Sequence, residues 1–142
     1  MDFVITHPKL QELFDYWQRK RGERAMPRRQ DVDPIDLRQM LPHIFLVDVE
    51  GQPARFRYRL VGTELTMIMG RELKGAYIDE MPFLFRKFAL PAYEEMIDRR
   101  TPSYKEVNAL EAFFTIRYKR LMLPLSENVT DINMILGGIY RV

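Results

Sequence analysis

Residues 55–60 read Arg-Phe-Arg-Tyr-Arg-Leu, a strict alternation of charged and apolar side chains. Successive side chains of a β-strand point to opposite faces, so the arginines share one face while Phe56, Tyr58 and Leu60 share the other. The preceding run, 44–49, is rich in β-branched and aromatic residues, and Glu50-Gly51-Gln52-Pro53 has the composition of a turn. We therefore predict an antiparallel hairpin with one buried face.

Two helices are predicted before this hairpin. Thr6 is suited to cap the first one, Pro8 fits its first turn, and Gly22 is a natural end. Asp33 is suited to cap a short second helix with Pro34 at its first position. The first helix has large apolar residues at i, i+3, i+4 and i+7, which place them on one stripe. These residues are Leu10, Leu13, Phe14 and Trp17.

The remainder of the chain alternates between helix and strand patterns. Gly62-Thr63 is expected to turn the hairpin into short helices that extend to about residue 100, with a kink or two abutting helices at Pro91. Strands are then predicted at 102–110, 114–125 and 132–140. The alternation slips at Arg120-Leu121, where we expect a bulge. Strands separated by a helical block favour an α+β fold with one antiparallel sheet.

This order of elements resembles that of a PAS domain, and more narrowly a bacterial PAS-like family with an N-terminal helical extension. The stretches that carry the resemblance are 17–22, 26–34, 41–42, 56–63 and 70–75, including the linker residues Pro27, Arg28, Arg29, Asp31 and Pro34. The resemblance implies a five-stranded antiparallel sheet with short helices on one face. It also implies a single domain over 1–142, with the extension and linker at 1–42 and the PAS core at 43–142, acting as a sensory or regulatory module.

The residue inventory argues against catalysis and most cofactors. The chain has no cysteine, which excludes a cysteinyl-flavin adduct, and no histidine lies in 79–100, where PAS domains that bind haem commonly carry their axial ligand. Only Ser103 and Ser126 are serines, and His7 and His43 lie on separate predicted elements, so neither a nucleophile nor a metal site is expected. No leader or membrane-spanning stretch is evident, which favours a cytoplasmic location.

A small apolar ligand between sheet and helices is one expectation for this domain, since methionines and aromatic residues make an adaptable lining. The alternative is a filled core without a cavity. The candidate pocket residues are Phe56, Tyr58, Met67, Phe88, Phe114, Tyr118 and Met134.

Signalling through protein contacts, including a homodimer, is the expected mode of action. The candidate dimer interface is the stripe of Leu10, Leu13, Phe14 and Trp17; the alternative is that this stripe covers the chain's own sheet. One alternative is a regulator that binds nucleic acid, but a net charge of +2 argues against it. A second is a small α+β enzyme that uses Tyr58 and Tyr118. The basic cluster of the first alternative comprises Arg19, Lys20, Arg21, Arg24, Arg28 and Arg29.

Overall fold

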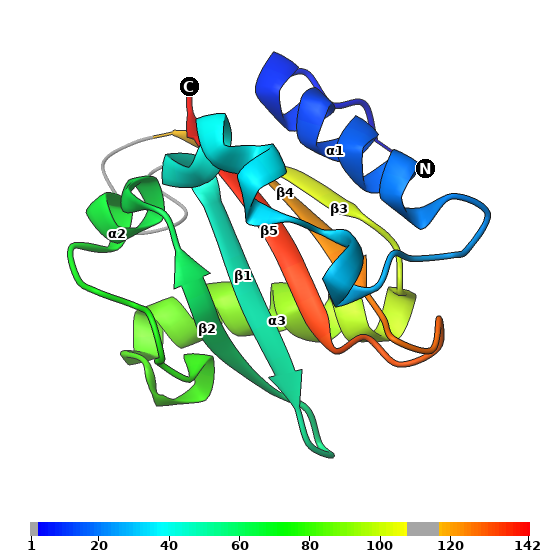
Figure 1. Ribbon diagram of the computed structural model, residues 1–142. Helices are drawn as coiled ribbons and strands as arrows, with labels where there is room; N and C mark the ends of the chain where they lie inside the picture. Colours follow the sequence, from blue (N-terminus) through cyan, green and yellow to red (C-terminus); the bar gives the residue numbers. More distant parts are fainter. Residues whose placement is uncertain (1–2, 108–116) are drawn as a thin grey trace.

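A single antiparallel sheet organises the molecule, whose computed structural model describes residues 3–107 and 117–142. The sheet has five strands in the order β2-β1-β5-β4-β3, so the first and last strands of the core are neighbours at its centre (Figure 1). The α+β fold class predicted from the sequence is confirmed. The strands are β1 (Ile44–Glu50), β2 (Arg55–Val61), β3 (Ser103–Val107), β4 (Tyr118–Leu125) and β5 (Met134–Arg141).

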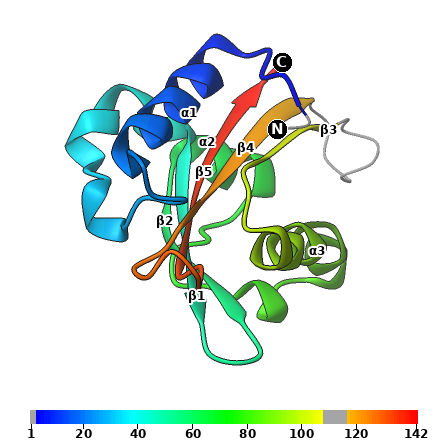
Figure 2. The same ribbon diagram turned by 90° about the vertical axis from the view of Figure 1, so that its right-hand side faces the viewer.

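Helices cover both faces of this sheet, which gives three layers (Figure 2). Helix α3 lies across one face with α2 beside it, and α1 lies on the opposite face. The described helices are α1 (Pro8–Arg21), η1 (Arg29–Asp31), η2 (Pro34–His43), α2 (Thr63–Met69), η3 (Ile78–Glu80) and α3 (Phe83–Arg99). Helix α3 runs through Pro91 as one element rather than two. The N-terminal extension is therefore the third layer of the fold.

The hairpin predicted at 44–60 is confirmed as β1 and β2. Phe56 and Tyr58 are each 2% exposed, whereas Arg55, Arg57 and Arg59 are exposed, as the alternation requires. Leu46 pairs with Leu60 and Val47 with Tyr58, so Arg59 is an extra residue in β2. The prediction that Leu60 shares the face of Phe56 and Tyr58 was wrong, because this extra residue turns Leu60 to the opposite face of the sheet. The bulge predicted at Arg120-Leu121 was wrong, because β4 pairs with β5 in unbroken register from Tyr118 to Leu125.

The apolar stripe of α1 packs on the chain's own sheet. Leu10 and Leu13 are fully buried, and Phe14 and Trp17 are 6% and 4% exposed. A Cβ added to Gly138 of β5 would lie 2.7 and 2.8 Å from the ends of Leu13 and Leu10, so helix and sheet are in close contact. The assignment of this stripe to a dimer interface was therefore wrong, because its side chains are already covered within one chain.

Helix α1 begins with a histidine cap. The expected cap was Thr6, but Nδ1 of His7 accepts a hydrogen bond from the Lys9 amide at 3.1 Å. Thr6 instead accepts a hydrogen bond from Nζ of Lys119 at 2.7 Å and so ties the N-terminus to β4. Both histidines, predicted to lie apart, pack on the ring of Tyr140, with centroid distances of 4.3 Å for His7 and 3.8 Å for His43.

This cap makes the stability of the fold depend on pH. Burial, and then the positive charges of Lys119, His43 and Lys9, lower the pKa of His7 below its usual 6.5. Between the lowered and the usual pKa the unfolded chain binds more protons, so the contribution of the cap is complete above pH 6.5 and is lost as the pH falls. We expect His7→Asn, whose cap does not titrate, to flatten the rise of Tm between about pH 5 and 7. An unchanged slope would contradict this role.

Candidate functional site

A small cavity lies between the sheet and the helices α2 and α3. Its volume is about 40 Å³. Four of its lining side chains carry polar atoms, Tyr58 on β2, Tyr93 on α3, and Tyr118 and Arg120 on β4. Apolar side chains close the remainder, namely Phe45, Leu65, Ile68, Met69, Phe85, Ala89 and Ile139.

Arg120 is a buried cation that forms no ion pair with any carboxylate of residues 3–107 and 117–142. The residue is 9% exposed, and its Nε is fully buried without a hydrogen-bond partner. Among the described residues, Glu95 is the carboxylate whose charge acts on Arg120, but Glu95 lies 3.0 Å from Arg99 and its side chain is 61% exposed. Burial lowers the pKa of Arg120, although an arginine keeps its proton at neutral pH. A buried, unpaired charge costs several kcal/mol, and a bound anion would relieve that cost.

The three tyrosines supply hydroxyl groups around this cation. The Tyr58 and Tyr93 hydroxyls lie 3.0 Å apart and form a hydrogen bond. Burial raises the pKa of Tyr93 and Tyr118 to about 12 and that of Tyr58 well above its usual 10. All three phenols therefore hold their protons at neutral pH, which suits them to donate hydrogen bonds and not to act as general bases. A guanidinium among phenol donors is an arrangement that binds an anion.

The structure brings only part of the predicted pocket together. Tyr58 and Tyr118 line the cavity, and Phe56 lies on the same face, stacked on Tyr93 at 5.5 Å between ring centroids. Placing Met67 in the pocket was wrong, because it is 65% exposed on α2. Placing Met134 there was also wrong, because it lines a groove on the opposite face of the sheet. Phe114 and the side chain of Phe88 lie outside the described part of the chain.

Sequence reasoning missed the two most informative residues of this site. Arg120 follows Tyr118 by two positions, so simple alternation predicts that it points to the same buried face. A bulge was predicted at this position instead, and Arg120 was not named as a pocket residue. Tyr93 lies three residues before Met96 and four after Ala89, on the buried side of α3, and this helical spacing was the available signal.

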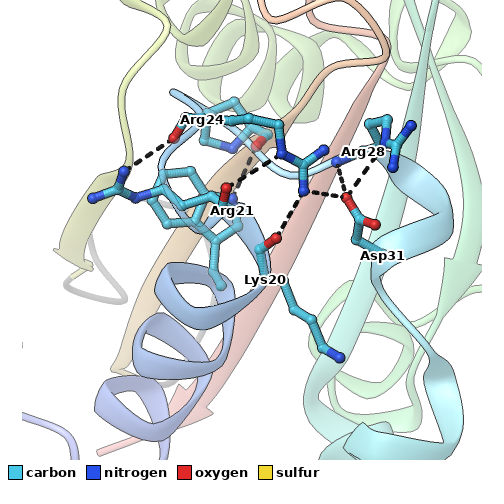
Figure 3. A network of polar contacts seen from close by, with 7 residues as sticks. Lys20, Arg21, Arg24, Arg28 and Asp31 are labelled. Carbon is cyan, nitrogen blue, oxygen red and sulfur yellow. Dashed lines mark hydrogen bonds and ion pairs between the residues drawn. The ribbon is translucent and has the colours of Figure 1, made fainter.

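The basic cluster at 19–29 has internal partners (Figure 3). The carboxylate of Asp31 accepts a hydrogen bond from Arg24 at 2.7 Å and another from the Arg28 amide at 2.8 Å. Arg24 and Arg21 also donate to backbone carbonyls at the end of α1, each at 3.0 Å. Such contacts favour a structural role for these cations, in which they hold the linker against the helix.

Neither a metal-binding cluster nor a membrane-spanning helix is present within residues 3–107 and 117–142. No group of three or more histidine, aspartate or glutamate residues there is arranged to hold a metal ion. No helix described in the structure has the length and apolar character needed to cross a membrane.

Comparison with known proteins agrees with this architecture. The sequence matches the PAS domain family over residues 5–140. Among solved structures, the PAS domain of Bordetella pertussis BvgS is similar, with a TM-score of 0.54 at 18% identity over 78% of this chain and 88% of that one. No curated protein matches the chain. Because the family match spans almost all of the sequence, the chain belongs to the PAS domain family.

Proposed function

We propose that this sensory or regulatory PAS domain responds to a small anion bound beside Arg120. The supporting observation is the guanidinium of Arg120, which is 9% exposed and has an unpartnered Nε inside a cavity lined by three tyrosines. An anion there would receive charge-assisted hydrogen bonds from Arg120 and ordinary ones from the phenols.

The size of the cavity limits the occupant. A cavity of about 40 Å³ corresponds to roughly three water molecules, so an anion of about three or four non-hydrogen atoms fits. Formate and nitrate have this size. A larger apolar metabolite, the ligand expected from the sequence, needs a pocket of about 300 Å³ or more. The small volume and the buried charge together favour the anion.

The signal would pass from the site to the surface through α3. Tyr93 places this helix directly on the cavity, and Tyr58 and Arg120 connect it to two strands of the sheet. An anion that binds one packing of α3 more tightly than another shifts the population toward that packing. We propose that a protein partner in the cytoplasm binds the outer face of α3. A second copy of this chain is one such partner.

Substitution of Arg120 tests the proposal in two ways. With Arg120→Met, the anion-free protein should gain about 1 kcal/mol or more in free energy of unfolding, because a buried charge that pairs with no carboxylate of the described residues is removed. Formate at about tenfold excess over its Kd should raise the Tm of the wild-type protein by about 5 °C and leave that of Arg120→Met unchanged. Differential scanning fluorimetry at constant ionic strength, with gluconate as the balancing anion, measures both effects.

Arg38→Met is the matched control. Arg38 is exposed on η2, so this variant loses the same charge without touching the cavity and should respond to formate like the wild type. Equal responses of Arg120→Met and the wild type, or no saturable response to formate and nitrate in the wild type, would refute the anion site. Light scattering with and without formate then tests the second copy as partner.

A further inference from the structure

An apolar recess with a charged rim lies on the opposite face of the sheet. It is a groove of about 510 Å³ beneath the linker and η2. Its volume falls in the range of about 300–1,000 Å³ that is typical of small-molecule sites, whereas the cavity at Arg120 does not. This groove is separate from the proposed anion site, because β1 and β5 lie between the two.

The floor of the groove is apolar and well packed. Ile44 of β1, Leu125 of β4 and Met134 of β5 are 2% exposed or less, and Leu46 and Leu60 are partly buried. These side chains come from four adjacent strands of the sheet, β2, β1, β5 and β4. An alkyl chain placed on this floor would lose most of its contact with water.

The rim of the groove carries an excess of positive charge. Arg59 is bound to Asp48 at 2.8 Å, which neutralises it, and Glu127 adds one carboxylate. Arg29 and Lys74 are exposed, and within residues 3–107 and 117–142 neither side chain makes an ion pair or hydrogen bond. Two unpaired cations thus lie on the rim of an apolar recess.

The chain holds this groove in shape. The Asp31 carboxylate connects Arg24 to the Arg28 amide and so fixes the linker that carries Arg29 (Figure 3). The Ser126 amide donates to the Pro27 carbonyl at 2.9 Å, which ties the linker to the end of β4. The bulge at Arg59 turns both Arg59 and Leu60 into the groove, an effect for which bulges are often retained near binding sites.

We propose that this groove binds an aliphatic carboxylate, with its alkyl chain on the strand floor and its carboxylate at Arg29 and Lys74. A guanidinium offers paired donors to a carboxylate, and a lysine adds a point charge. Charge complementarity selects an anionic head, since a cationic or neutral head would leave these cations unpaired. The Pro27–Pro34 linker would thus form part of a binding site, whereas it has no role in the anion site at Arg120.

Titration calorimetry with octanoate and decanoate tests the groove. Each buried methylene should tighten binding about fourfold, so decanoate should bind about fifteenfold more tightly than octanoate at a single site. The double variant Arg29→Gln/Lys74→Gln should weaken octanoate binding about tenfold or more. Both positions are exposed, so the variant should fold normally.

Matched controls separate this site from non-specific adsorption and from the proposed function. Arg38→Gln/Lys87→Gln removes the same charge from exposed positions outside the groove and should bind octanoate like the wild type. Octylammonium should not bind, and Arg120→Met should leave the octanoate affinity unchanged. Equal affinity for octylammonium, an unaffected Arg29→Gln/Lys74→Gln variant, or no saturable binding of octanoate would overturn the proposal.

Discussion

Gly62→Ala should destabilise the domain by about 3 kcal/mol or more, which is a large part of the stability of a typical domain. Gly62 joins β2 to α2, and a Cβ there would lie 2.3 Å from the Leu41 carbonyl oxygen and 2.5 Å from that of Pro42. Both atoms belong to the backbone of η2, so no side-chain rotation can relieve the clash. Urea unfolding of the two proteins measures the change.

Gly70→Ala is the comparison that isolates the cause. Gly70 has a φ of 70° in open space, so alanine there meets no atom and costs only the strain of the left-handed conformation, about 1–2 kcal/mol. Gly62 has a φ of −70°, which any residue adopts. Its glycine is required for close approach of two backbones. A Gly62→Ala variant no less stable than Gly70→Ala would show that η2 moves aside at little cost.

Trp17→Ala should destabilise the domain by about 3–5 kcal/mol. Trp17 is 4% exposed between α1 and the sheet, it stacks on Phe14, and its Nε1 donates to the Pro124 carbonyl at 2.9 Å. Alanine loses the packing and leaves the carbonyl unsatisfied. Trp17→Phe keeps most of the packing and should lose about 1–3 kcal/mol for the missing hydrogen bond alone.

Two further measurements test the packing of this stripe on the chain's own sheet. If α1 covers its own sheet, the loss in Tm for Trp17→Ala is the same at low and high protein concentration. Leu13→Asp with Phe14→Asp should then unfold the domain, since both side chains are buried within one chain. A folded double variant would contradict the packing of this stripe within the chain.

Local periodicity explains why much of the fold was predictable. The alternation at 55–60 and the i, i+3, i+4, i+7 stripe at 10–17 each describe one element and its buried face, and both elements form where expected. Asp33 was also correctly identified as a cap, with its carboxylate accepting the Ile35 amide at 2.9 Å. These features depend only on residues within about four positions of one another, so they can be recognised in the sequence without knowledge of the tertiary structure.

The candidate site was less predictable, because its residues break the rules that identify a core. Arg120 was not named as a candidate, and charged residues are rarely buried without a partner. The actual bulge at Arg59 has no local signal in a run that alternates perfectly. Met67 and Met134 show the same limit, because both fit an apolar lining by type while one is exposed and the other faces the opposite layer.

The Arg55–Leu60 alternation and the helical stripes determined, from sequence alone, an α+β chain with a half-buried hairpin and an amphipathic first helix. Only the tertiary structure decided what covers each apolar face. An amphipathic pattern predicts that a face is buried but does not identify the element that covers it. The reason is that the free energy gained depends on the apolar area removed from water, and not on which chain or element removes it. The covering of the sheet by α1 and the enclosure of Arg120 therefore became visible only in the folded molecule.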